Sequence, residues 1–166
     1  MAERPNGDFA HTILRQFFFA AYMNPFWRAM TGSVDRQLAA HAGKAVKETA
    51  YHIRHSGEWV IRLGDGTEES AYRMATALDD LAPYIGEMFE TDETASRLIM
   101  AGVLPDPAPV RAAFEDTVAQ TFAMATMPPF EVQLDQRWQE WPPYRGLGHL
   151  LAEMQQMQRA YPGLKW

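Results

Sequence analysis

The side chains best suited to chemistry lie on one predicted long helix near the middle of the chain. Glu48, His52 and His55 are spaced i, i+4 and i+7, which places them on one helix face. A second pair, His149 and Glu153, is spaced i, i+4 near the end of the chain. Helical bundles build di-iron sites from carboxylates and imidazoles on facing helices, and these ligand types suit iron. Glu48, His52, His149 and Glu153 are therefore the candidate metal ligands.

The pattern of a di-iron site is incomplete, however. Such sites use Glu-x-x-His on two helices and a further Glu on each of two others. Tyr51 stands three residues after Glu48, and Gln156 stands three residues after Glu153. A pair such as Glu48 and His52 more commonly lies on a solvated or partner-facing surface. We therefore predict no catalytic residue and no cofactor in this chain.

Composition excludes several other classes of protein. The 166 residues are enough for one domain. A net charge of −6 argues against a nucleic-acid-binding module, which needs a basic surface. The absence of cysteine excludes a disulfide framework, a thiolate zinc site and a cysteine nucleophile. The most apolar run, Phe17 to Met23, is far shorter than the roughly 20 residues of a membrane span. We expect a cytoplasmic protein that binds neither nucleic acid nor membrane.

The elements that must position the candidate residues are predicted to be helices. Capping residues, prolines and apolar periodicity predict helices from Asp8 to before Asn24-Pro25, Ser33 to Leu63, Thr67 to Pro83, Asp92 to Ala101, Asp106 to Thr126 and Leu147 to Ala160. The best strand candidate, residues 59–63, continues the helical pattern. Residues 127–145 contain two Pro-Pro pairs and two tryptophans, and they are predicted to form a loop or arm. The sequence predicts a single all-α domain over residues 1–166.

Two of these helices carry features that predict their packing. On the long second helix, a seam of small and apolar residues at heptad spacing favours a closely packed neighbour: Ala39, Ala42, Val46, Thr49, Ile53, Ser56, Val60 and Leu63. The second half of the first helix, residues 17–23, is apolar on every side, so other helices are expected to cover it all round.

Three segments carry a resemblance to a known family. The first is Pro5-Asn6-Gly7-Asp8-Phe9-Ala10-His11-Thr12. The second contains Lys47-Glu48, Tyr51-His52 and Arg54-His55-Ser56, and then Trp59 to Ser70. The third runs from Leu147 to Gln155 and ends with Gln158 to Gly163. In these segments the chain resembles the family shared by the A and C subunits of bacterial phenylacetyl-CoA epoxidase, and within that family the C subunits, over their C-terminal two-thirds.

The resemblance implies a ferritin-like helical fold and a role. In that complex the A subunit holds the di-iron centre and the CoA-ester substrate, activates dioxygen and epoxidises the aromatic ring. The C subunit is a structural partner that has lost most iron ligands. The resemblance thus implies that this chain is a non-catalytic subunit that pairs with an iron-containing subunit in aerobic phenylacetate degradation. We expect partner contacts at Glu48, His52, His55, Trp59, Trp138 and Trp141.

Departures from the family pattern carry a further expectation. Family members usually have another helical region before the segment that matches Pro5, so this chain is expected to lack the usual N-terminal helices. Ala71 stands where the family commonly has His, and residues 142–146 replace a stretch that contains His and Glu. The apolar first helix would normally be covered by the missing helices. Because exposed apolar side chains cost about 1.5–3 kcal/mol each relative to burial, we expect self-association, domain swapping or an obligate partner.

Two alternatives stay open at this point. The first is a ferritin-like metal-binding oxygenase in its own right, with a metal held by Glu48, His52, His149 and Glu153 across a dimer. The second is a free-standing helical protein that forms homo-oligomers and acts through interactions. Stoichiometric iron would favour the first alternative, whereas a stable homo-oligomer that binds no epoxidase subunit would favour the second.

Overall fold

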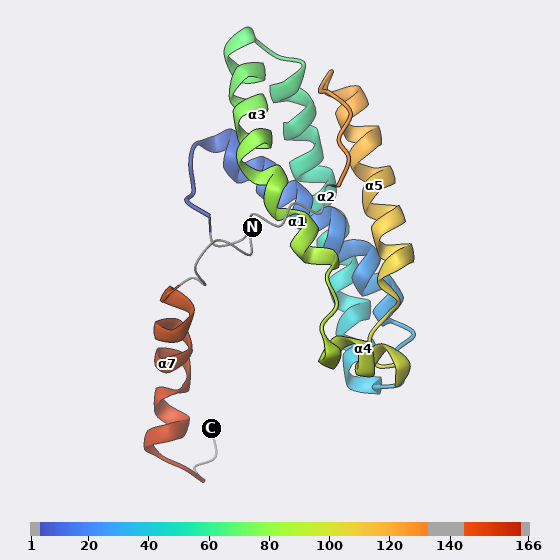
Figure 1. Ribbon diagram of the computed structural model, residues 1–166, viewed down its shortest axis with the longest axis vertical. Helices are drawn as coiled ribbons and strands as arrows, with labels where there is room; N and C mark the ends of the chain where they lie inside the picture. Colours follow the sequence, from blue (N-terminus) through green and yellow to red (C-terminus); the bar gives the residue numbers. More distant parts are fainter. Residues whose placement is uncertain (1–3, 133–144, 164–166) are drawn as a thin grey trace. The chain divides into compact units, whose positions relative to one another are not determined.

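The computed structural model describes residues 4–132 and 145–163, and for residues 145–150 it describes the backbone alone. The regular elements in these ranges are all helices (Figure 1): α1 (Phe9–Met30), α2 (Arg36–Gly64), α3 (Glu68–Leu81), η1 (Ala82–Tyr84), η2 (Gly86–Phe89), α4 (Glu93–Met100), α5 (Pro107–Met124) and α7 (Arg145–Ala160). They fall into two compact units, one containing α1 to α5 and the other containing α7. The predicted all-α class is confirmed, and a single domain over residues 1–166 stays a prediction.

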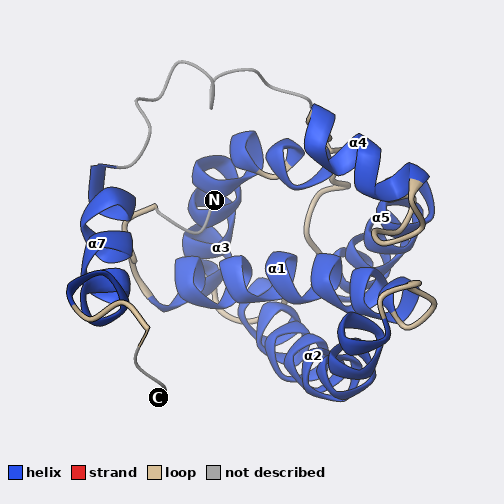
Figure 2. Cartoon of the chain, turned by 90° about the horizontal axis from the view of Figure 1, so that it is seen from below, coloured by secondary structure: helices blue, strands red, loops and turns tan. Residues whose placement is uncertain are grey.

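Helix α1 is the central element of the first unit. It packs against α2, α3 and α5, and Figure 2 shows these helices on different sides of it. Its rings Phe17 and Phe18 are fully buried with Phe114 and Phe122 of α5. The centroid of the Phe18 ring lies 6.1 Å from that of Phe114 and 6.0 Å from that of Phe122. A cluster of phenyl rings between α1 and α5 therefore forms the middle of the core.

The predicted cover of α1 is confirmed for most of its apolar half, with one exception. Of residues 17–23, Phe17, Phe18, Ala20 and Ala21 are buried and the two residues that follow them are half-buried. Phe19, in contrast, is 45% exposed. Helices of this chain thus cover most of the segment that the missing N-terminal helices were expected to cover, and Phe19 is the apolar side chain of residues 17–23 that stays exposed.

The predicted end of α1 before Asn24-Pro25 is wrong, because the helix continues through Pro25. The buried side chain of Asn24 explains this continuation. Its amide nitrogen donates to the Val46 carbonyl and to the Thr49 hydroxyl of α2, both at 3.0 Å. Its amide oxygen accepts a hydrogen bond from Arg28 Nε, also at 3.0 Å. Packing against α2 holds the helix in place despite the backbone hydrogen bond that proline removes.

Helix α2 is long and uses the predicted seam to pack on α1. The contacts between α1 and α2 are the most extensive in the unit. Ala42, Ser56 and Val60 of the seam are buried, and the other seam residues are half-buried. The helix begins at Arg36 rather than Ser33, because the side chain of Asp35 accepts hydrogen bonds from the first backbone amides. Residues 59–63 are helical, as predicted.

The remaining helices of the first unit begin at the predicted capping residues. Thr67 caps α3 in a capping box with Ser70, Asp92 caps α4, and Asp106 caps α5 ahead of Pro107. Helix α5 ends at Met124, two residues before the predicted end. Of the predicted arm over residues 127–145, the part up to residue 132 packs on the core through Phe130 and Val132. Residues 133–144, which include Trp138 and Trp141, lie outside the described residues.

The second unit contains α7, which was predicted from Leu147 to Ala160 and which runs from Arg145 to Ala160. The large apolar side chains of Leu151, Met154 and Met157 on this helix are exposed. Among the helices of the described ranges, none is long and apolar enough to cross a membrane.

Candidate functional site

The residues of α2 that were predicted to bind a metal or a partner lie together on its solvent-exposed side. Glu48, Tyr51, His52 and His55 are all exposed, and we call these four residues the outer α2 face. The ring of Tyr51 stacks on that of His55, with centroids 5.9 Å apart and an interplanar angle of 13°. It also makes an edge contact with His52 at 5.8 Å. The guanidinium of Arg54 lies 5.6 Å from the centroid of Tyr51. The face is therefore an aromatic and polar surface rather than a cleft.

Two of the four candidate metal ligands share one surface of the first unit. Glu48 and His52 share the outer α2 face, whereas Glu153 is exposed on α7 in the other unit, and the side chain of His149 lies outside the described part. Within the described ranges, no group of three or more His, Cys, Asp or Glu side chains could hold a metal ion. A metal site formed by these four residues stays a prediction.

Trp59 lies beside the outer α2 face, near the end of α2, and is half-buried. Its indole makes an edge contact with the ring of Phe9, with centroids 5.2 Å apart, while Phe9 itself is 52% exposed. The Arg62 guanidinium lies 5.4 Å from the centroid of Trp59. Trp59 thus joins the start of α1 to the end of α2 and extends the exposed aromatic surface. Of the predicted partner-binding tryptophans, it alone lies within the described residues.

A second polar cluster joins the start of α1 to α3, and sequence reasoning assigned no functional role to its members. We call Asp8, His11, Arg73 and Asp80 the His11 cluster. His11 Nδ1 lies 2.8 Å from Asp8 Oδ1, and His11 Nε2 lies 3.0 Å from Asp80 Oδ2. Arg73 Nη1 lies 3.5 Å from Asp8 Oδ2. The imidazole, which is only 15% exposed, therefore bridges a carboxylate of α1's cap and a carboxylate of α3.

Electrostatics within this cluster favour its charged form. The hydrogen bond to Asp8, with a further one to Asp80, raises the pKa of His11 above its ordinary value. The same hydrogen bond from His11 lowers the pKa of Asp8. Asp8 also caps α1 by accepting from the backbone amide of His11. The cluster thus stabilises the junction of α1 and α3 as an ion-paired clasp.

One signal for this clasp was present in the sequence. Asp8 was identified as the cap of the first helix, and His11 stands three residues later, so their side chains had to lie close together. Asp80 is 69 residues further along the chain than His11, and no local pattern connects the two. Only the packing of α3 on α1 shows that the histidine has a second carboxylate.

Comparison with known proteins decides the family. The family model for "Phenylacetic acid catabolic protein" matches residues 1–166. This chain belongs to that family. It is 38% identical over 170 residues to the C subunit of 1,2-phenylacetyl-CoA epoxidase from Escherichia coli (strain K12). The alignment covers 100% of this chain and 67% of that protein. The family is ferritin-like, and the helical structure of the described residues agrees with the predicted fold class.

Among the described residues, the core of the first unit supplies no ligands for a di-iron centre. Bundles of the di-iron class place carboxylates and imidazoles from four helices around the metals in the core. Here the space between α1 and α5 is filled by Phe17, Phe18, Phe114 and Phe122, all fully buried. The acid and histidine side chains of α2 point to solvent, away from this ring cluster. Phenyl rings supply no metal ligand, so the described core offers no donor set for iron.

Proposed function

We propose that this chain is a non-catalytic structural subunit that pairs with the di-iron catalytic subunit of a phenylacetyl-CoA ring epoxidase in aerobic phenylacetate degradation. In this proposal the complex acts in the cytoplasm and the partner subunit holds the iron. The observation that carries the proposal is the core of phenyl rings in a chain that aligns over all of its residues with 67% of the C subunit of such an epoxidase. A core of this kind can support a partner but gives no ligands for oxygen chemistry.

The outer α2 face is the proposed docking surface. Tyrosine and arginine are enriched among the residues that dominate binding energies at interfaces. Tyr51 is 52% exposed, and its ring is flanked by His52, His55 and Arg54. A helix face that holds an aromatic ring in place before binding loses little side-chain entropy when a partner covers it. These features favour a protein partner on this side of α2.

Co-expression with the catalytic subunit from the same source tests the proposal. Size-exclusion chromatography with light scattering measures whether a mixed complex forms, and metal analysis measures the iron in each fraction. We expect a stable mixed complex, and we expect the iron to follow the catalytic subunit. If the catalytic subunit elutes alone, or if the isolated chain carries stoichiometric iron, the proposal is wrong.

A matched pair of tyrosine variants locates the surface. Tyr51 and Tyr72 are both exposed tyrosines on helices, but Tyr72 lies on α3, outside the outer α2 face. Loss of a central interface residue typically costs about 1–2 kcal/mol or more, so Tyr51→Ala is expected to weaken the complex about tenfold. Tyr72→Ala is expected to leave the affinity within about twofold. Equal effects of the two variants on a complex that still forms would place the docking surface elsewhere.

A further inference from the structure

The two asparagines of the chain lie in opposite environments. Asn6 is exposed in the segment before α1 and is followed by Gly7. Asn24 is buried within α1 and is followed by Pro25. Asparagine is a thermolabile residue, because its side-chain amide can be attacked by the backbone nitrogen of the next residue. The two sites therefore differ in how open they are to covalent change.

The peptide bond between Asn6 and Gly7 meets the requirements of this attack. Glycine has no Cβ atom, so no side chain hinders the approach of its nitrogen to the Asn6 side chain. Neither the side chain of Asn6 nor the backbone amide of Gly7 makes a hydrogen bond to another residue in the ranges that the structure describes. Both residues are exposed to water, which takes up the amide proton and completes the reaction.

Asn24 lacks both of these conditions. Pro25 carries no N–H, so its nitrogen cannot lose a proton and attack. The side-chain nitrogen of Asn24 is also held, because it donates to the Val46 carbonyl and to the Thr49 hydroxyl, both at 3.0 Å. Asn24 is thus an internal control for a reaction at Asn6.

The reaction at Asn6 has two steps and needs only water as a co-reactant. In the first step, the Gly7 nitrogen loses its proton and bonds to the side-chain carbonyl carbon of Asn6, while the bond from that carbon to the amide nitrogen breaks. The amide nitrogen leaves as ammonia with the proton that Gly7 lost, and a cyclic imide remains. In the second step, water opens the ring. Attack on the side-chain carbonyl gives aspartate in an ordinary backbone, whereas attack on the backbone carbonyl gives isoaspartate, in which the chain runs through the former side chain.

Contacts on both sides of Asn6 make the isoaspartyl product disruptive. On one side, Arg15 Nη2 donates to the carbonyl oxygen of Pro5. On the other side, the Gly7 backbone lies so close to His11 that a Cβ atom at Gly7 would be 2.6 Å from Cγ of the ring. Isoaspartate adds a carbon atom to the backbone between these two anchors, so at least one of the contacts must shift.

A shift of Gly7 acts on the His11 cluster. His11 Nδ1 is held by Asp8, which follows Gly7 in the chain and caps α1. His11 Nε2 lies 3.0 Å from Asp80 Oδ2, and this hydrogen bond joins α1 to α3. The Gly7 backbone packs on the imidazole that makes both bonds. Displacement of Gly7 therefore disturbs the ring position on which the bond to Asp80 depends.

We propose that Asn6 deamidates spontaneously in the folded chain and that the isoaspartyl product weakens the hydrogen bond between His11 and Asp80. Loss of one such bond is expected to lower the Tm of a chain of this length by about 2–4 °C. The aspartyl product keeps the ordinary backbone and is expected to shift the Tm by less. Asn6 lies outside the outer α2 face, and its reaction does not depend on the proposed function.

Incubation of the full chain in mildly alkaline buffer at physiological temperature tests the chemistry. Trypsin places the two asparagines in different peptides, because Asn6 precedes the cleavage after Arg15 and Asn24 follows it. Mass spectrometry detects the exchange of the amide for a carboxyl group, and electron-based fragmentation distinguishes isoaspartate from aspartate. We expect both products at Asn6 and neither at Asn24.

Three variants separate the effect of the backbone from that of the charge. Asn6→Gln keeps the amide on a longer side chain, which disfavours the ring, so it is expected to stay unmodified and to keep its Tm during the incubation. Asn6→Asp, measured before incubation, supplies the charge on an ordinary backbone. In His11→Ala the isoaspartyl form is expected to cost no further Tm, because the bond that it weakens is already absent. Ion exchange separates modified from unmodified chains before thermal unfolding.

Three results would overturn the proposal. The first is an Asn6 that stays unmodified in the folded chain, whether or not the urea-unfolded chain reacts. The second is an isoaspartyl form with the same Tm as Asn6→Asp, which would show that the backbone change is absorbed without loss. The third is an equal loss of Tm in the wild type and in His11→Ala, which would show that the product acts elsewhere than on the His11 cluster.

Discussion

Three glycines of α2 share one helix and differ in what surrounds them, so the same substitution is expected to have three different effects. A Cβ atom at Gly43 would meet nothing within 4 Å. At Gly57 it would lie 3.6 Å from Cε2 of Phe17, an ordinary contact distance. At Gly64 it would lie 2.5 Å from the backbone oxygen of Ala125, where α5 ends.

The expected changes in the free energy of unfolding follow from these distances. Gly43→Ala is expected to raise it by about 1 kcal/mol, since alanine is the better helix former at an exposed interior position. Gly64→Ala is expected to lower it by about 1–3 kcal/mol, because a backbone oxygen cannot move unless the end of α5 moves with it. Gly57→Ala is expected to lie between the two, because its new methyl group meets the buried Phe17 ring at an ordinary contact distance, with less room than at Gly43 and without the close approach to backbone found at Gly64.

Urea unfolding followed by far-UV circular dichroism measures the three differences, and thermal unfolding supplies a second readout. A change of 1 kcal/mol shifts the Tm of a chain of this length by about 2–4 °C. The order Gly43→Ala, Gly57→Ala, Gly64→Ala from most to least stable is the result expected. If Gly64→Ala were as stable as Gly43→Ala, the close approach of α2 to the end of α5 would be refuted.

Other perturbations test the clasp, the core and the surface of α1. The pKa of His11 is raised in the folded chain, so the stabilisation that its charge provides is complete below about pH 6.5 and is lost as the pH rises through the raised pKa. The pKa of Asp8 is lowered, so the stabilisation that its carboxylate provides is complete above about pH 4 and is lost as the pH falls through the lowered pKa. The Tm difference between wild type and His11→Gln is therefore expected to be largest between these limits, and a pH-independent difference would contradict the ion-paired clasp. Phe18→Ala is expected to cost about 3–5 kcal/mol in urea unfolding, because the ring is fully buried. Phe19→Ala is expected to cost less than about 1 kcal/mol, and equal costs would contradict the described packing of α1. In the absence of a partner, the exposed rings of α1 are expected to make the chain self-associate at micromolar concentration. A stable monomer in sedimentation velocity at that concentration would contradict this expectation.

Local signals predicted the helices well because each signal acts within one or two turns. Asp8, Thr67, Asp92 and Asp106 are capping residues whose side chains bond amides only two or three residues away. The seam of α2 was visible because its residues recur every three or four positions, and the buried Ala42, Ser56 and Val60 belong to it. Such features depend on neighbouring residues, so the sequence alone carries them.

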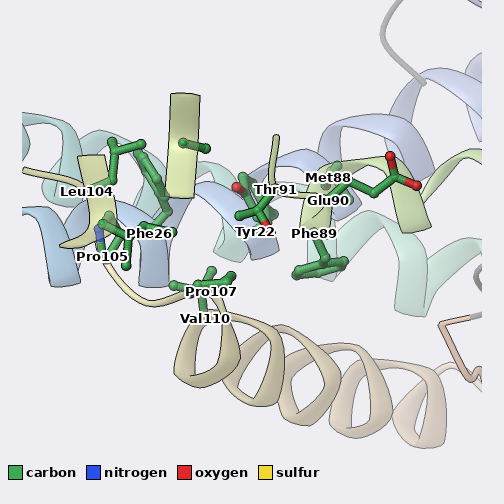
Figure 3. Close-up of a pocket in the computed structure, with 12 residues that line it drawn as sticks. Tyr22, Phe26, Met88, Phe89, Glu90, Thr91, Leu104, Pro105, Pro107 and Val110 are labelled. Carbon is green, nitrogen blue, oxygen red and sulfur yellow. The ribbon is translucent and has the colours of Figure 1, made fainter. Parts of the chain in front are cut away.

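Features that depend on distant residues could not be predicted in the same way. Pro25 predicts a helix end locally, yet Asn24 holds α1 against α2 through hydrogen bonds to residues more than 20 positions away. The pairing of His11 with Asp80 likewise requires the packing of α3 on α1. A cavity of about 90 Å³ beside Tyr22 is likewise lined by residues of α1, α4 and α5, which lie far apart in the sequence (Figure 3). In each of these cases tertiary packing outweighs or adds to the local pattern.

The buried polar groups of the described residues support a structural role for the core. The buried polar residues are Asn24, Ser56 and Thr121, and Arg15 Nε is a further buried atom, which has no hydrogen-bond partner among the described residues. The hydroxyl of Ser56 donates to the His52 carbonyl at 2.6 Å, and that of Thr121 donates to the Thr117 carbonyl at 2.9 Å, each within its own helix. Asn24 uses its amide to join α1 to α2. Asn24 joins two helices, whereas Ser56 and Thr121 each bond within their own helix, so none of these three side chains is free to bind substrate or metal. Under the proposed function, the chain's contribution to the complex is the surface that it offers to the partner subunit.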